Sequence, residues 1–99
     1  MTEQPQQNEP LPIVLYATVV AHKAYFSRVE LPTLLSHLGV PLALWTAADE
    51  FWLEQIGSAI HKPDATILAT FGNTFTAIRR QLDQRQPSLD DLEPLVTPP

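Results

Sequence analysis

The chain has 99 residues, a net charge of −5 and no cysteine. At this length it forms one domain at most, with a core too small to enclose a deep active site that excludes water. The acidic balance and the scattering of the six Lys and Arg residues argue against a primary nucleic-acid role. Without cysteine there are no disulfides, thiolate zinc sites or thiol nucleophiles.

Residues 1–12 are rich in Gln, Glu and Pro, a composition that predicts a disordered tail. The start of the chain lacks the basic region of a signal peptide. Its uncharged stretch, residues 11–21, is shorter than the ~20 residues of a membrane span. We therefore expect a cytoplasmic protein without membrane insertion.

The secondary structure of residues 13–28 is the hardest to predict from the sequence. Their apolar side chains cover every face of a helical wheel, and several are β-branched, so periodicity alone does not separate a buried helix from a strand. A lone strand would need a pairing partner that the rest of the chain does not offer. We therefore predict a helix, which is either the central helix of the domain or one half of an interface.

Prolines and one glycine divide the next part of the chain. Pro32 suits a first helical turn and Gly39 a left-handed helix end, which predicts a short helix over 32–38. Pro41 then opens a longer helix over 42–61, ending near Lys62 and Pro63. One face of that helix holds Trp45 and Trp52, which we expect in the core unless one of them is partly exposed at an interface. An apolar flank beside this face holds Leu42, Leu53 and Ile60.

The last helix is predicted over 65–84, with Asp64 at its N-cap. An apolar stripe at steps of three and four residues marks its packed side: Ile67, Leu68, Phe71, Phe75, Ile78 and Leu82. No ionisable side chain occurs from Ala65 to Ile78, whereas an exposed helix ordinarily carries Glu and Lys. Its outward side would present Thr66, Ala69, Thr70, Asn73, Thr76 and Ala77. This lack of charge is typical of interface cores, although a helix enclosed in the bundle would show it too.

Residues 86–99 hold four prolines and predict a flexible tail, in which Ser88 and Asp91 can cap one turn. Its acidic and apolar string, Leu89, Leu92, Leu95 and Val96, suits folding into a groove on binding. The predicted fold is thus all-α, a compact bundle of about four helices over 13–85 between disordered tails.

No catalytic or metal-binding pattern is apparent. His22, His37 and His61 are too far apart for helical ligand spacing, which leaves only a cluster made by the fold. Glu50 and Glu54 share a face with each other, but it is the solvated one. Ser36 and His37 are adjacent and so point apart on a helix. We expect no enzyme activity and no cofactor.

Residues 34–45 resemble a helix-turn-helix, with Leu38-Gly39-Val40 at the turn. A recognition helix needs basic and polar side chains, and the helix that follows has no Lys or Arg before Lys62. A DNA-binding regulator therefore stays an alternative rather than the first choice.

The run from Leu31 to Leu82 also resembles small helical accessory proteins associated with bacterial type VI secretion, among PAAR-like and effector-associated genes. The shared pattern is Leu38-Gly39-Val40, then Trp45 and Trp52 seven apart with Ala48-Asp49 between them, then Asp64, Phe71-Gly72 and Phe75. The resemblance implies a cytoplasmic adaptor that binds secreted cargo or a spike component without catalysis. The chain departs from the pattern at residues 58–62 and in its tails.

The sequence thus predicts a non-enzymatic adaptor that binds a protein partner or a second copy, and no nucleic acid. The alternatives are a helix-turn-helix regulator and a small hydrolase or lyase built on clustered His22, His37 and an acid. The candidate binding residues are Leu42, Trp52, Leu53, Ile60, Thr66, Thr70, Asn73 and Thr76.

Overall fold

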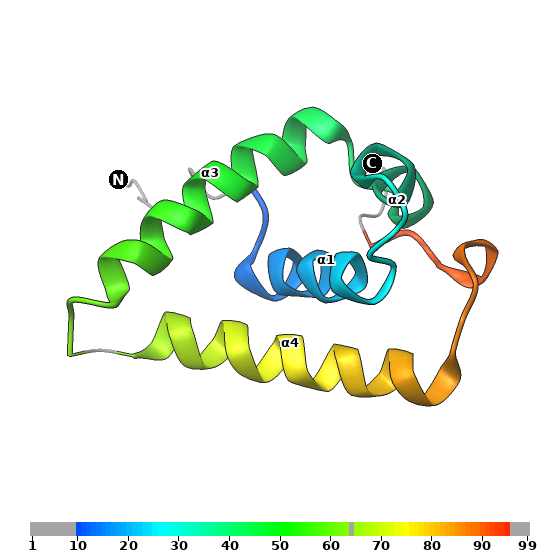
Figure 1. The fold of residues 1–99 in the computed structure, drawn as a ribbon. Helices are drawn as coiled ribbons and strands as arrows, with labels where there is room; N and C mark the ends of the chain where they lie inside the picture. The colour runs from blue at the N-terminus through cyan, green and yellow to red at the C-terminus, as the bar shows by residue number, and fades with distance from the viewer. Residues whose placement is uncertain (1–9, 64, 96–99) are drawn as a thin grey trace, which may run out of the picture.

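A computed structural model describes residues 10–63 and 65–95 of the chain. Over these residues the chain forms four α-helices, a short 3-10 turn and no strand (Figure 1). The elements are α1 Ile13–Tyr25, α2 Leu31–Leu38, α3 Leu42–Ala59, α4 Thr66–Arg85 and η2 Leu89–Asp91. The all-α class is therefore confirmed. The segment for which periodicity alone did not distinguish a helix from a strand is helical, as predicted.

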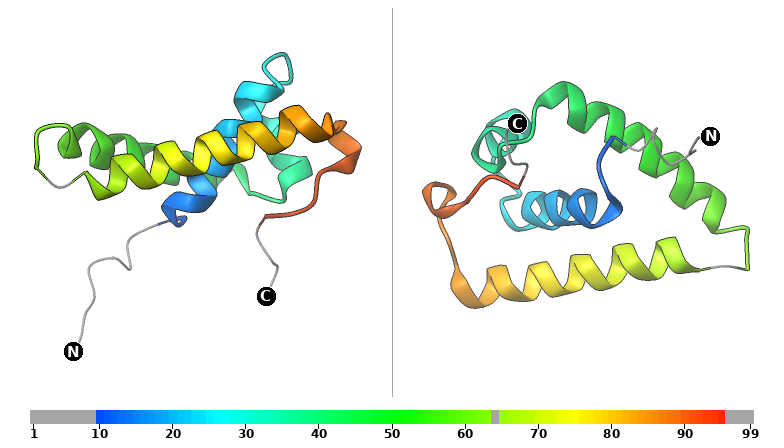
Figure 2. Two further views of the ribbon diagram at one scale, coloured as in Figure 1. Left: turned by 90° about the horizontal axis from the view of Figure 1, so that it is seen from below. Right: turned by 180° about the vertical axis from the view of Figure 1, so that it is seen from behind.

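Helix α1 is the central element of the domain. In Figure 1, α3 and α4 diverge from their connection with α1 between them, and Figure 2 shows α1 crossing α4. Six α1 residues are buried: Tyr16, Ala17, Thr18, Val19, Ala21 and His22. This position explains the absence of charge from Leu11 to Ala21, because neighbouring elements cover much of this part of α1, and its only Lys, Lys23, lies in the last turn. Of the two roles predicted for this helix, the central helix of the domain or one half of an interface, it has the first.

The turn between α2 and α3 depends on Gly39. Its φ of 70° is left-handed, a conformation that glycine adopts without steric cost. The Val40 N–H donates to the Leu35 carbonyl at 3.0 Å, which satisfies one carbonyl at the end of α2. The chain then changes direction by 105° between α2 and α3. Leu34, Leu35 and Leu38 of α2 are buried in the core beside Trp45 and Trp52.

Residues 86–95 differ from the flexible tail that was predicted for them. Leu89, Leu92 and Leu95 pack against the core, and the Leu95 N–H donates to the Leu38 carbonyl at 2.7 Å. The predicted cap is present, since the backbone N–H of Ser88 donates to the Asp91 carboxylate at 3.0 Å. The apolar contacts of these three leucines offset part of the entropy cost of ordering the segment.

Leu11, assigned to the other tail, is also buried, at 3% exposed. Residues 1–9 and 96–99, including Val96, and the predicted N-cap Asp64 lie outside the described residues. Within the described ranges, no single helix is long and apolar enough to cross a membrane, although the bent pair α2–α3 meets a test of length and composition alone.

Candidate protein-interaction surfaces

The first candidate surface is a line of apolar side chains along α3. Leu42, Leu53 and Ile60 are 50%, 58% and 64% exposed. Together with Thr46, half-buried Asp49 and half-buried Ile56 they form a row spaced by four, three, four, three and four residues. We call this row of six residues the α3 flank. Because this spacing keeps residues on one side of a helix, the exposed apolar groups lie in a single row, in which Thr46 and Asp49 separate Leu42 from Leu53.

The edge of the α3 flank is negatively charged. Asp49, Glu50 and Glu54 all belong to α3, which has no Lys or Arg along its length. Glu50 and Glu54 are exposed, while Asp49 accepts a 2.8 Å hydrogen bond from the Tyr16 hydroxyl. Burial, and then the hydrogen bond and charge of Asp49, raise the pKa of Tyr16 well above its usual range. The row thus combines apolar side chains with Thr46 and Asp49, and the exposed carboxylates of Glu50 and Glu54 lie along its edge.

Trp52, predicted among the partner-binding residues, is buried instead. It is 5% exposed, and its indole Nε1–H donates to the Leu11 carbonyl at 2.8 Å. Trp45 is also buried and stacks on Tyr16 with ring centroids 5.1 Å apart. The acceptor for Trp52 comes from 41 residues away in the chain, so helical periodicity could not reveal it. Trp52 does not contribute to the α3 flank.

The second candidate surface is the outward side of α4, which we call the α4 outer face. The predicted residues Thr66, Asn73 and Thr76 are exposed there, and Thr70 is half-buried. Ala69 and Ala77 lie exposed among them. This face is neutral and made of small side chains, as the sequence predicted.

The apolar stripe of α4 is only partly covered. Leu82 is the one α4 residue that is fully buried in the described structure, and Phe71 and Phe75 remain half-buried with their rings stacked at 6.2 Å. Helix α1, with 13 residues, crosses α4, with 20, and cannot cover all of it. Apolar surface therefore remains accessible along α4 as well.

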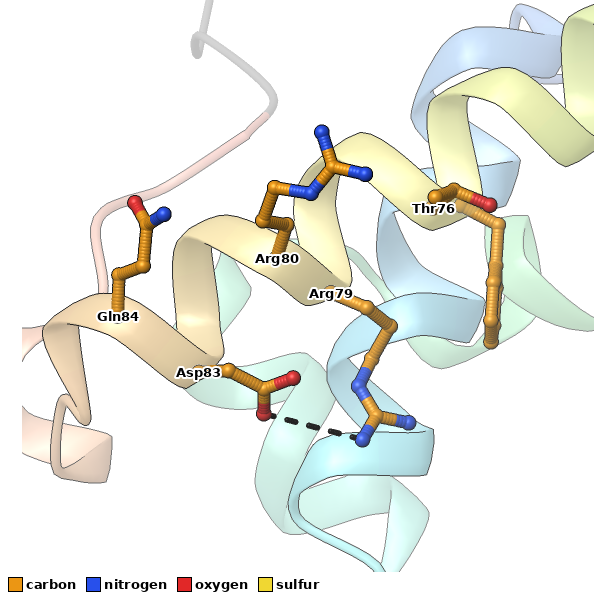
Figure 3. Close-up of a pocket in the computed structure, with 6 residues that line it drawn as sticks. Thr76, Arg79, Arg80, Asp83 and Gln84 are labelled. Carbon is orange, nitrogen blue, oxygen red and sulfur yellow. Dashed lines mark ion pairs between the residues drawn. The ribbon is translucent and has the colours of Figure 1, made fainter.

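A shallow hollow of about 490 Å³ lies on the second half of α4 (Figure 3). All its lining residues belong to α4: Phe75, Thr76, Arg79, Arg80, Asp83 and Gln84. Arg79 approaches Asp83 at 3.9 Å one turn on, and its Nε is buried without a hydrogen-bond partner. Because a single helix supplies every lining residue, the hollow is a gap between long side chains and not an enclosed site.

A smaller hollow of about 260 Å³ brings His22 near Arg85, Asp91 and Glu93. The Nδ1 of His22 lies 2.8 Å from the Thr18 carbonyl, an arrangement in which Nδ1 carries the proton. His37 does not line this hollow, and none of its lining residues carries a nucleophilic hydroxyl, thiol or amine. The clustering of His22 and His37 that would favour a hydrolase or lyase is thus not formed. Over the described ranges, no three His, Asp or Glu side chains are grouped to hold a metal ion.

The geometry of α2 and α3 matches one requirement of a helix-turn-helix and fails another. Their 105° angle and three-residue turn with Gly39 are typical of the motif. However, α3 would present the carboxylates of Asp49, Glu50 and Glu54 to the phosphates of DNA. It has no Lys or Arg side chain that could bind these phosphates.

Comparisons of this chain with family models, with curated proteins and with solved structures find no match.

Proposed function

We propose that this protein is a non-enzymatic adaptor that binds another protein through the α3 flank and the α4 outer face. The observation that carries the proposal is the alignment of Leu42, Leu53 and Ile60 on one side of one helix. Three of the four large apolar residues that are exposed in the described structure lie in this single stripe. Scattered exposed apolar residues are ordinary, but exposed apolar residues that share one side of a helix are typical of interaction sites, and here Leu53 and Ile60 lie on either side of half-buried Ile56.

The neutral α4 outer face supports the same function. Interface cores are depleted in charged residues, and small side chains let a partner backbone approach closely. By contrast, the acidic α3 gives no support to a DNA-binding role. From the resemblance to type VI secretion accessory proteins, we propose that the partner is secreted cargo or a spike component and that binding occurs in the cytoplasm.

The proposal is tested by capture experiments with matched surface variants. The full chain is used as bait in lysate of its native host, and captured proteins are quantified by mass spectrometry. Leu53→Glu with Ile60→Glu is compared with Val14→Glu, since Val14 is the exposed apolar residue that lies off α3, at 48% exposure. Charge on the α3 flank should reduce recovery of a specific partner about tenfold or more, whereas Val14→Glu should not.

Asn73→Arg tests the α4 outer face in the same assay. It should also lower recovery while changing the free energy of unfolding by no more than about 0.5 kcal/mol, as exposed substitutions usually do. If Asn73→Arg unfolds the domain, that face is core. If all variants capture the same proteins in equal amounts, the adaptor proposal is wrong.

A further inference from the structure

We infer that the segment seated on the α3 flank is an amphipathic helix of a partner protein that carries Lys or Arg beside its apolar stripe. This inference rests on the proposed function and names the chemistry of the partner. It follows from the spacing of the apolar groups, the charge at their edge and the composition of the rest of the chain.

The spacing favours a helical occupant. The α3 flank alternates steps of four and three residues from Leu42 to Ile60, which is the spacing of a seam between two helices packed at a shallow angle. A strand repeats its side chains every second residue and would meet this row at few points. Since α3 has 18 residues, a matching partner helix spans about five turns.

The edge charge favours a basic occupant. Any helix on the α3 flank passes beside Glu50 and Glu54, which are exposed, and no cation of α3 compensates them. Lys or Arg on the facing edge would pair with these carboxylates, whereas Asp or Glu would be repelled. Close charges of this kind govern which partner is accepted more than they raise affinity in general.

A second copy of the chain does not supply this charge through α3. Glu50 and Glu54 lie near the middle of the helix, so pairing α3 with another α3 brings acids near acids in either direction. Helix α4 of a second copy carries Arg79 and Arg80, but α1 already covers part of its apolar stripe, so less of that stripe is open to the α3 flank. We therefore assign the α3 flank to a helix of a different protein, and the oligomeric state of the chain tests this choice.

The rest of this chain does not supply it either. Residues 86–95 contain Asp90, Asp91 and Glu93 but no Lys or Arg. They are also already packed beside α2. In sequence, residues 1–9 carry two acids and no Lys or Arg, and residues 96–99 carry no charge. If one of these segments occupied the α3 flank, its charges would repel Glu50 and Glu54 or give no electrostatic attraction to them.

The test uses two synthetic helical peptides of about 20 residues that share one stripe of leucines at steps of three and four. One has Lys at the positions beside the stripe, and the other has Glu there. Binding to the full-length chain is measured by fluorescence anisotropy at about 0.1 M salt. The Lys peptide should bind at least about tenfold more tightly than the Glu peptide, and Leu53→Glu should abolish its binding.

The matched control separates a local edge from the overall charge of the protein. Glu50→Gln with Glu54→Gln should lower the preference for the Lys peptide to about threefold or less. Asp90→Asn with Glu93→Gln changes the net charge by the same amount away from α3 and should leave the preference intact. Circular dichroism checks that each variant remains helical.

Four results overturn the inference. Three of them are equal binding of the two peptides, an equal loss of preference in both charge variants, and no saturable binding of either peptide up to about 1 mM. The fourth is a doubled mass in light scattering that is lost in Leu53→Glu, which would assign the flank to a second copy. Each of these results concerns only the chemistry of the occupant, since the capture experiment measures separately whether the α3 flank binds a protein at all.

Discussion

Tyr16 connects three helices through one side chain. Its ring stacks on Trp45 of α3 and lies 5.9 Å from Phe71 of α4, while its hydroxyl donates to Asp49. The sequence identified Phe71 as a packing residue and Trp45 as core, but nothing in the pattern linked Tyr16 to Asp49, 33 residues away. Such a hydrogen bond depends on how two helices cross, which periodicity within one helix does not determine.

Tyr16→Phe should lower the free energy of unfolding by about 1 kcal/mol at neutral pH, because it removes one partly buried hydrogen bond. Its effect should also depend on pH. Burial and Asp49 raise the pKa of Tyr16 in the folded protein, so the unfolded chain loses this proton first. The contribution of Tyr16 to the free energy of unfolding is therefore fully present below about pH 10. It falls as the pH rises towards the pKa of Tyr16 in the folded protein, by up to about 1.4 kcal/mol per pH unit.

Urea titrations between pH 7 and pH 11, followed by fluorescence of the two buried tryptophans, measure this difference. The advantage of the natural protein over Tyr16→Phe should shrink in the alkaline range. A difference that stays constant from pH 8 to pH 11 would show that Tyr16 keeps an ordinary pKa.

At the scale of elements, the helices were predicted from local signals. Pro32 marks where α2 begins, Gly39 where it ends and Pro41 where α3 begins, and the apolar stripe of α4 is visible in the spacing of its own residues. The position of α1 was not decided by sequence, since the stretch without charge from Leu11 to Ala21 suits both a core and an interface. For the candidate surfaces too, local spacing predicted some features, while others depend on how the helices pack. The exposure of Leu42, Leu53 and Ile60 agrees with the helical wheel, which also places Trp52 on the core face, but the hydrogen bond from Trp52 to the distant Leu11 carbonyl could not be predicted.

Gly39→Ala should destabilise the protein by about 1–3 kcal/mol. Alanine disfavours the left-handed φ of 70° at this position, and its Cβ would lie 2.9 Å from the Cβ of Pro94. Gly57→Ala is the matched control, because Gly57 lies within α3 and nothing is within 4 Å of a Cβ there. That change should stabilise the protein by about 0.5–1 kcal/mol. Thermal unfolding of both variants checks the prediction, and equal melting temperatures would contradict it.

At the scale of the whole molecule, long-range contacts join both outer segments to the bundle. The sequence assigned residues 86–95 to a loose tail on the basis of prolines and acids. It could not show that Leu89, Leu92 and Leu95 would find an apolar site between distant helices. Amphipathic helices were therefore predictable, while the placing of short segments against them was not.

A chain ended after Arg85 should lose about 2–3 kcal/mol of stability, because three half-buried leucines no longer pack on the core. Full-length protein with Asp90→Asn is the control, since Asp90 is exposed. Chemical denaturation gives both values. Equal stability of the shortened and full-length chains would mean that this segment adds nothing to the fold.

The hydrogen bond from Leu95 to the Leu38 carbonyl has a consequence for how the protein is made. A chain still being synthesised can form its helices from local interactions, but the carbonyl at the end of α2 gains its donor only when residue 95 has been delivered. Until then, the apolar surface of α2 that Leu95 later covers stays open to water and to chaperones. Completion of the core is therefore expected after translation of this segment, with the earlier nascent chain more open to proteolysis than the finished protein.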